Sequence, residues 1–468
     1  MIDVFALHSP YGLMTATAAI DAGLVPPAVD ADGAVVAPRR VLLAVGSSAV
    51  PETAPDLAAD PAWRTLRDRF DRVESLNALV DPHHPRDWIP AEQDHPMLGR
   101  LLRRAWDAET ERIRLFVQSP QVAPARTLMT LFDQAEILVV GDGLMTYSPI
   151  RDRLPRQVTE RIAGVILADV VPGVVPLVFV ETGAPRIPVP APALRAVIDE
   201  VDAGSDATVR PAGGEPVALV LGQYLAALGL ATEAEEQEMQ AQMVDRAAEW
   251  GVAGIVFKPH PAATAGLVSH VRERAAAHGL SFAVHEGDEP AELVARRIGA
   301  EGVVAGFSTA LPTVQTLFGV RIASAGTRTV LRGLTPYENS NRIPATIVDA
   351  LTRRRSPYAR PEDLQLLVDA VGYCMQPRIL AALRPRAEEL LRRLGRVEIA
   401  RYFDPERLAA LDLPGAPVPT WRDRARRRVG LGPALVDTGG VSRLEQVGLT
   451  IQGARRRAAR VWRTVRGR

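Results

Sequence analysis

Residues 254–261, which read GIVFKPHP, hold the pattern that decides the fold of this 468-residue chain. The run Gly254–Phe257 is apolar throughout, which is typical of a strand buried on both faces of a parallel sheet. Proline on both sides of His260 excludes regular helix or strand there, so the strand ends in a stiff loop. Ligands of open α/β sheets bind beyond the carboxyl ends of the strands. The stretch therefore predicts an α/β fold with a functional loop at 258–261.

Short apolar runs alternate with helical patterns on both sides of this stretch. The predicted strands are residues 2–7, 40–45, 113–117 and 136–140 in the first half, and 217–221, 254–257, 280–284 and 302–305 in the second. The predicted helices between them are residues 11–22, 62–70, 97–108, 233–250, 270–278 and 290–298. This rhythm predicts two successive Rossmann-like α/β domains that face each other across a cleft.

The proline-rich segment 183–192 is predicted to be an extended linker at the hinge between the domains. The expected organisation is an N-terminal domain over 1–190, a C-terminal domain over 191–375, helices over 376–412 that pack back, and a basic tail over 413–468. Residues 451–468 contain seven arginines and no acid, with apolar residues interleaved. That pattern predicts contact with a membrane surface, or else a solvated tail.

Composition limits the class of protein. Lys+Arg and Asp+Glu number 55 each, so no overall charge draws the chain to nucleic acid or membrane. The one cysteine, Cys374, excludes an internal disulfide and a multi-cysteine metal site, and is expected in the core. The N-terminus lacks a secretory signal pattern and no apolar run is long enough to span a bilayer. We expect a cytoplasmic protein, or one peripheral at the inner face of the membrane.

Two residues of the quoted stretch carry the strongest functional signal. Lys258 is the only lysine of the chain, all other residues of the Lys/Arg class being arginine. A position that keeps lysine against such a bias is one where a compact ammonium is needed. The pair His-Pro also occurs at 84–85 and 95–96, where we expect structural turns. His260 differs from these copies because it follows a predicted strand and lies two residues after Lys258.

Two further strands end in candidate site residues. The strand 302–305 leads to Gly306, Ser308 and Thr309, where a helix could begin. Hydroxyls at that position cap the helix, or the free amides and the helix dipole bind a phosphate. The strand 136–140 ends at Asp142, which lies between two glycines. An acid exposed there is a candidate general base, and an ordinary turn is the alternative.

These three motifs, in this order, resemble the bacterial polysialyltransferase family and its lipooligosaccharide sialyltransferase relatives. The family's acidic pair with glycine, its His-Pro and its later Ser-Ser or Ser-Thr correspond to residues 142–143, 260–261 and 308–309. The strand and loop that end at Gln223, and the segment Pro290–Glu292, are also similar to family features. The resemblance covers roughly residues 1–351.

The resemblance implies a GT-B fold and an inverting, metal-independent transfer of a sialic-acid-like sugar from a CMP donor to a surface glycan, without a cofactor. Asp142 would remove the proton of the acceptor hydroxyl and His260 would protonate the leaving phosphate. The residues expected to bind the donor are Lys258, Pro261, Gly306, Ser308, Thr309, Gln223 and Glu292. The expected partners are a nucleotide-sugar donor and a glycan acceptor, and not nucleic acid.

One departure from the family pattern bears on the acceptor side. The first acid of the family's pair is Gly141 here, so Asp142 serves as the base or the base comes from elsewhere. Two other functions stay open at this point. The chain could be an inactive GT-B-like scaffold in surface polysaccharide assembly, or a GT-B transferase or epimerase that uses another nucleotide sugar.

Overall fold

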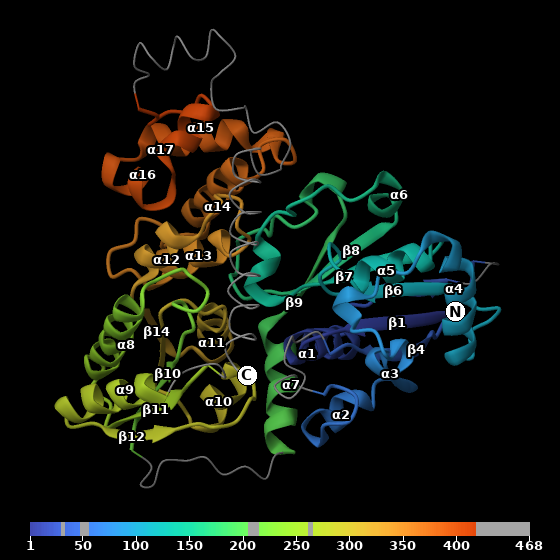
Figure 1. Cartoon of the computed structure of the whole chain (residues 1–468), viewed down its shortest axis with the longest axis horizontal. Coiled ribbons are helices and arrows are strands. Elements are labelled where there is room, and N and C mark those ends of the chain that lie inside the picture. Colours follow the sequence, from blue (N-terminus) through green and yellow to red (C-terminus); the bar gives the residue numbers. More distant parts are fainter. Residues whose placement is uncertain (30–32, 47–55, 205–214, 261–264, 418–468) are drawn as a thin grey trace, which may run out of the picture. The chain divides into compact units, whose positions relative to one another are not determined.

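The computed structural model describes residues 1–29, 33–46, 56–204, 215–260 and 265–417. It divides into two units, of which the first comprises residues 1–334 and 340–368, and the second residues 335–339 and those from 369 onward. Figure 1 follows the chain from β1 (Ile2–Leu7) in blue to α17 (Pro405–Ala410) in orange. Two parallel sheets, each with its own helices, make up the first unit.

The first sheet has seven parallel strands in the order β5-β4-β1-β6-β7-β8-β9. The strand order reverses between β1 and β6, which is the point where open α/β sheets bind ligands. The other strands are β4 (Arg39–Ala44), β5 (Arg72–Ser75), β6 (Ile113–Val117), β7 (Glu136–Val140), β8 (Ile162–Ala168) and β9 (Arg186–Val189), and a separate hairpin pairs β2 (Ala28–Val29) with β3 (Val35–Val36). The helices are α1 (Pro10–Asp21), α2 (Arg64–Arg67), α3 (Leu76–Val80), α4 (His95–Ala105), α5 (Ala125–Leu131), α6 (Arg156–Thr159) and α7 (Ala191–Ala203).

A buried ion pair joins the central strands β1 and β6. The Arg114 guanidinium donates two hydrogen bonds of 2.7 Å to the Asp3 carboxylate, and both side chains are almost completely buried. Arg114 also donates to the carbonyls of Pro26 and Pro27, at 2.8 and 3.2 Å. All three nitrogens of the Arg114 guanidinium donate to an acceptor. The two charges are therefore tolerated inside the sheet.

The second sheet has five parallel strands in the order β12-β11-β10-β13-β14. Its strands are β10 (Val217–Leu221), β11 (Gly254–Lys258), β12 (Ser281–Val284), β13 (Gly302–Ala305) and β14 (Arg321–Ser324). The strand order reverses between β10 and β13. The helices that follow are α8 (Glu233–Ala248), α9 (Ala265–Ala277), α10 (Ala291–Arg297), α11 (Ala310–Phe318), α12 (Thr327–Gly333) and α13 (Arg342–Thr352).

The second unit is helical and has its own buried cation. Its helices are α15 (Arg384–Arg393), α16 (Arg396–Tyr402), α17 and the end of α14 (Pro361–Met375). Arg407 donates to the carbonyls of Cys374 and Met375, at 2.6 and 3.1 Å, and forms an ion pair of 2.8 Å with Glu338. Cys374 is buried, as the sequence predicts.

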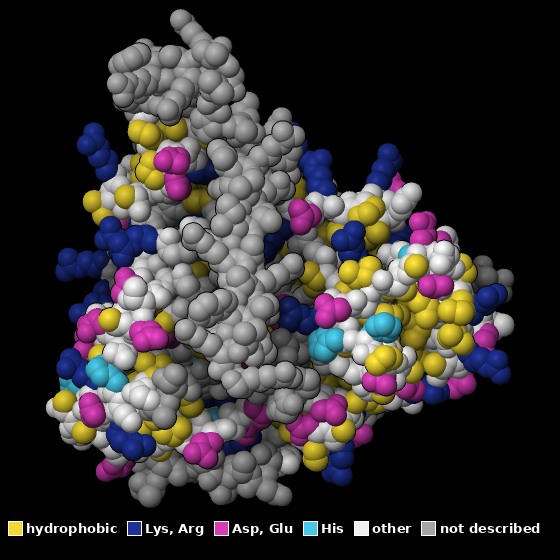
Figure 2. All heavy atoms as spheres, in the orientation of Figure 1, with side chains coloured by type: hydrophobic (Ala, Val, Ile, Leu, Met, Phe, Trp, Pro, Cys, Tyr) yellow, Lys and Arg dark blue, Asp and Glu magenta, His cyan; other side chains and the backbone are white. Residues whose placement is uncertain are grey.

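The described surface mixes charges of both signs. On the face that Figure 2 shows, basic and acidic side chains are interspersed rather than gathered into separate fields. No described helix is long and apolar enough to cross a membrane. The arginine-rich segment 451–468 lies outside the described residues.

The α/β fold with two Rossmann-like parallel sheets is confirmed, and five of the predicted strands, 2–7, 113–117, 136–140, 217–221 and 302–305, have the observed bounds. The linker predicted at 183–192 is wrong, because Arg186–Val189 forms β9 at the edge of the first sheet. An edge strand pairs on one side only and therefore tolerates proline, and Pro188 is exposed there. The predicted domain boundaries stay predictions.

Candidate functional site

Three loops meet at the carboxyl edge of the second sheet. The strands β11, β10 and β13 lie next to one another, with Leu221 paired to Lys258 on one side and to Ala305 on the other. The residues that follow these strands therefore emerge side by side at the point where the strand order reverses. This arrangement brings Gln223, Lys258 and His260, and the 306–309 segment, to one edge.

Hydrogen bonds lock the three loops together. The Gln223 side chain is buried, and its amide oxygen accepts a bond of 3.0 Å from the Phe307 amide while its amide nitrogen donates to the Gly222 carbonyl at 3.2 Å. The Gly222 amide in turn donates to the Lys258 carbonyl at 2.8 Å. A Cβ atom at position 222 would lie 2.9 Å from Pro259 Cα and 3.1 Å from the His260 amide nitrogen, so this close approach requires glycine.

The lone lysine lies at the end of β11 with its ammonium partly buried. Lys258 Nζ donates a hydrogen bond of 2.6 Å to the Gly287 carbonyl. Burial lowers the pKa of Lys258, while the carboxylates of Glu289 and Asp288 raise it. An ammonium carries three N–H donors, and the bond to Gly287 uses one of them. No hydrogen bond of the other two donors is seen among the described residues.

A network of charges holds the loop that binds Lys258. Glu289 pairs with the His285 ring at 2.8 Å and with Arg297 at 2.8 Å, and Arg297 also pairs with Asp202 at 3.0 Å. The bond from His285 lowers the pKa of Glu289 to about 2, against the opposing effect of burial and with a further lowering by Arg297. The loop carbonyl that positions Lys258 is therefore anchored by a carboxylate that stays ionised.

His260 stacks face to face on the Tyr224 ring. The ring centroids lie 4.9 Å apart with an angle of 2° between the planes. The stack covers one face of the imidazole, and partial burial lowers the pKa of His260. The nearby Glu236 carboxylate raises that pKa and the Lys258 ammonium lowers it further. Pro261, the next residue, lies outside the described residues.

The 306–309 segment closes the edge from the side of β13. Ser308 Oγ accepts a hydrogen bond of 3.2 Å from the Ala310 amide, which caps the start of α11. Thr309 is the N-cap residue of that helix but its side chain makes no capping bond. Gly306 lies in the turn, where an added Cβ would approach Met239 and Met243 to about 3.1–3.2 Å. The Ser308 hydroxyl thus binds one amide at the start of the helix. A phosphate site at Ser308 and Thr309 stays a prediction.

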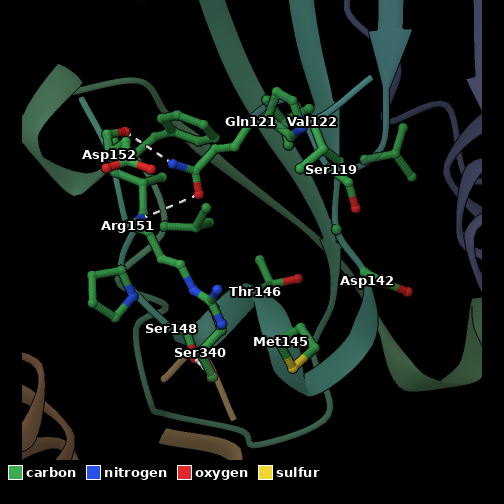
Figure 3. Close-up of a pocket in the computed structure, with 18 residues that line it drawn as sticks. Ser119, Gln121, Val122, Asp142, Met145, Thr146, Ser148, Arg151, Asp152 and Ser340 are labelled. Atoms are coloured by element: carbon green, nitrogen blue, oxygen red, sulfur yellow. Dashed lines mark hydrogen bonds between the residues drawn. The ribbon is translucent and has the colours of Figure 1, made fainter. Parts of the chain in front are cut away.

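A second candidate site lies at the carboxyl edge of the first sheet. Asp142 follows β7, at the start of a short 3-10 helix (Gly143–Tyr147), and lines a cavity of about 370 Å³. Figure 3 shows the polar side chains that share this cavity. They are Ser119, Gln121, Thr146, Ser148, Arg151, Asp152 and Ser340.

One wall of this cavity is held by side-chain hydrogen bonds. Gln121 donates to the Asp152 carbonyl at 2.9 Å and accepts from the Arg151 amide at 3.2 Å. Arg151 extends along the wall, where its Nε donates to Ser340 Oγ at 2.6 Å (Figure 3). The wall therefore presents a fixed guanidinium, a group suited to bind a carboxylate.

The backbone beside Asp142 leaves no room for a second acid. A Cβ atom at Gly141 would lie 2.6 Å from Thr146 Oγ1 and 3.2 Å from the Ile166 carbonyl oxygen. A contact of 2.6 Å requires the neighbour to move, and a carboxyl group would add further atoms to the same space. The glycine at this position is thus part of the packing, and Asp142 is the acid that the motif retains.

Sequence reasoning missed three residues of these two edges. His8 follows β1 directly, and its Nε2 lies 3.1 Å from Ser119 Oγ at the point where the first sheet reverses its order. Tyr224 and Glu236 adjoin His260 at the edge of the second sheet. The position of His8 immediately after a predicted strand is a signal that the sequence did contain.

Glu292 takes a different place from the other predicted donor residues. It is buried in the first turn of α10, and burial raises its pKa. Burial and the Glu292 carboxylate raise the pKa of the Tyr11 hydroxyl in α1. The part that Glu292 takes in donor binding stays a prediction. Within the described ranges, no group of three or more His, Cys, Asp or Glu side chains could hold a metal ion.

The chain is similar to known proteins in structure more than in sequence. No curated protein matches the chain. Three solved structures are similar at low identity. A mutant O-GlcNAc transferase of Thermobaculum terrenum is 12% identical, with 84% of this chain and 67% of that chain covered and a TM-score of 0.34. MurG of Acinetobacter baumannii is 10% identical, with 83% of this chain and 95% of that chain covered and a TM-score of 0.37. A UDP-GlcNAc 2-epimerase of Methanocaldococcus jannaschii is 9% identical, with 80% of this chain and 99% of that chain covered and a TM-score of 0.37.

A family model identifies the chain more directly than these structures do. The model described as alpha-2,8-polysialyltransferase matches residues 3–327, which is well over half of the chain and includes Asp142, Lys258, His260 and Ser308. The chain therefore belongs to the alpha-2,8-polysialyltransferase family and is a glycosyltransferase.

Proposed function

We propose that the protein transfers a sialic-acid-like nonulosonic sugar from a CMP donor to a hydroxyl of a surface glycan, with inversion and without a metal ion or cofactor. The observation that supports this most is the convergence of Lys258, His260 and Ser308 at the edge where the second sheet reverses its order. An ammonium, an imidazole and the start of a helix are the groups expected around a leaving phosphate.

On the donor side, each group has a separate task. The Lys258 ammonium offsets the negative charge that grows on the phosphate as the sugar leaves. His260, when protonated, gives its proton to the phosphate oxygen that receives the electron pair of the broken bond. The hydroxyls of Ser308 and Thr309, together with the dipole of α11, would hold the phosphate or the sugar carboxylate.

On the acceptor side, the cavity beside Asp142 would hold the end of the glycan. Asp142 takes the proton of the attacking hydroxyl while its oxygen forms the new bond to the anomeric carbon of the sugar. The bond from that carbon to the phosphate breaks on the opposite face, so the configuration inverts. The Arg151 guanidinium in the cavity wall suits an acceptor that carries a carboxylate.

Binding of the nucleotide tests the donor assignment. We expect CMP to raise the melting temperature of the wild-type protein, and UMP or UDP to raise it much less. A protein that ignores CMP and its sugars but is stabilised by UDP or a UDP-sugar would show that the donor is a different nucleotide.

Turnover tests the role of His260. General acid catalysis contributes about 10²–10⁴-fold, so His260→Ala should lose activity by that factor. The matched control is His84→Ala, which removes the imidazole of another His-Pro pair whose Nδ1 accepts from the Arg86 amide in a short turn. Equal losses in the two variants would contradict a catalytic His260.

The location of the protein is a separate part of the proposal. We propose that the reaction takes place in the cytoplasm and that the seven arginines of 451–468 bring the protein to the inner, anionic face of the membrane. Co-sedimentation with vesicles of phosphatidylcholine and phosphatidylserine should be lost when 451–468 is deleted. Unchanged binding by the truncated chain would refute the contact.

A further inference from the structure

We propose that Tyr224 and Glu236 are positioning residues for His260, with Glu236 fixing the loop that carries Tyr224 and Tyr224 fixing the imidazole by stacking. The inference rests on the proposed function for the role of His260 as the proton donor. The two residues lie on β10's following loop and on α8, and neither belongs to a motif that the sequence singled out.

Glu236 is a buried carboxylate that binds backbone rather than a cation. One of its oxygens accepts from the Leu225 amide at 2.9 Å and the other accepts from the Ala226 amide at 3.0 Å. Burial of an ionised carboxylate is costly unless its oxygens are satisfied, and here two adjacent amides satisfy them. The two amides belong to the residues immediately after Tyr224, so the carboxylate sets the position of that ring.

The Tyr224 ring transmits this anchoring to His260. The two rings are nearly parallel, at 2°, with centroids 4.9 Å apart, and the His260 side chain lies at the surface. Tyr224 and Glu236 also border a cavity of about 390 Å³, lined by Gln223, Thr232 and Leu267 among others. If the Glu236 carboxylate were removed, the Tyr224 ring could move into this cavity. We therefore infer that the Tyr224–His260 stack depends on Glu236.

The same carboxylate biases the charge of the imidazole. Among the described residues, the Glu236 carboxylate raises the pKa of His260 and the Lys258 ammonium lowers it. Donation of a proton requires the imidazolium form, and burial together with Lys258 opposes that form. Glu236 therefore favours the form of His260 that the reaction needs, in addition to holding its stacking partner.

Four variants separate positioning from general stability. Tyr224→Phe retains the ring and should have near wild-type kcat, whereas Tyr224→Ala should lose on the order of 10- to 100-fold in kcat. Glu236→Gln should lose activity increasingly as the pH rises, because the pKa of His260 falls and less imidazolium remains. Glu238→Gln removes the same charge from an exposed site on α8 and should leave the pH profile unchanged.

A readout without turnover keeps the inference separate from the proposed function. NMR titration of the His260 ring, assigned with His260→Ala, should give a lower pKa in Glu236→Gln than in the wild type or Glu238→Gln. Its ring chemical shifts should also change in Tyr224→Ala and persist in Tyr224→Phe. If these titrations behave as stated but CMP is neither bound nor used, the positioning holds and the proposed function fails.

Three results would overturn the positioning roles. They are an unchanged His260 pKa in Glu236→Gln, equal kcat values for Tyr224→Phe and Tyr224→Ala, or a loss in Tyr224→Ala that is fully explained by a lower melting temperature. Circular dichroism of each variant at the assay temperature supplies that last control.

Discussion

Gly141→Ala tests whether the backbone beside Asp142 is packed as described. The added Cβ would lie 2.6 Å from Thr146 Oγ1 and 3.2 Å from both the Ile166 carbonyl oxygen and Leu167 Cβ. Thr146 is buried and its hydroxyl has no hydrogen-bond partner among the described residues, so the side chain must shift against its surroundings. Overpacking of this kind costs about 1–3 kcal/mol.

Alanine also restricts the unfolded chain, which acts in the opposite direction to the overpacking and is smaller. Replacing glycine by alanine restricts the unfolded chain and stabilises a protein by about 0.4–1 kcal/mol where the new side chain fits. We therefore expect a net loss of about 1–2 kcal/mol in the free energy of unfolding. Gly266→Ala is the control, because its Cβ would meet nothing within 4 Å in α9, and it should be neutral or slightly stabilising.

Urea unfolding of both variants gives the comparison, with Thr146→Ala used to complete a double-mutant cycle. Because Thr146 Oγ1 is the nearest atom, Gly141→Ala should cost less in the Thr146→Ala background, with a coupling of about 1 kcal/mol. A Gly141→Ala protein as stable as Gly266→Ala, or an additive cycle, would refute the packing argument. Gly141→Asp should accordingly fail to raise transfer activity.

Three further predictions concern charges. Lys258→Met should weaken CMP binding by about 10- to 100-fold, since a hydrogen bond to a charged group contributes about 1.5–3 kcal/mol, and calorimetry that shows unchanged affinity would contradict it. Asp3→Asn should destabilise the fold by about 3–5 kcal/mol because Arg114 is left buried without its counter-charge, which urea unfolding measures. Glu289 has a folded pKa of about 2, below the ordinary value of 4.5, so its contribution, about 1–3 kcal/mol, is present above pH 4.5 and lost as the pH falls toward 2. Acid unfolding of Glu289→Gln should show a flatter pH dependence between those values.

Much of the fold could be predicted because its strands are buried on both faces. Apolar runs such as 217–221 and 302–305 leave little choice of structure, and their bounds are the observed ones. The linker prediction at 183–192 is wrong because a strand that pairs on one side only, such as β9, tolerates a proline, here Pro188. Edge position is a tertiary property that no local pattern of residues 183–192 contains.

The loop residues of the candidate site could be predicted from the sequence, but the residues that hold those loops in place could not. Position after a buried strand and an unusual residue were enough to select Lys258 and His260. Tyr224 and Glu236 carry no such local signal, because a stack and a carboxylate bound to two amides exist only after β10, β11 and α8 have packed. The crowding at Gly141 likewise depends on Thr146 and Ile166, which local sequence does not place there.

A crystal structure of the protein with CMP bound tests the central claim most directly. The account predicts the phosphate at the carboxyl edge of the second sheet, with an oxygen at a hydrogen-bond distance of about 3 Å from Lys258 Nζ and with His260 and the start of α11 beside it. CMP bound at another edge of the fold, with its phosphate in contact with neither Lys258 nor His260, would contradict the claim.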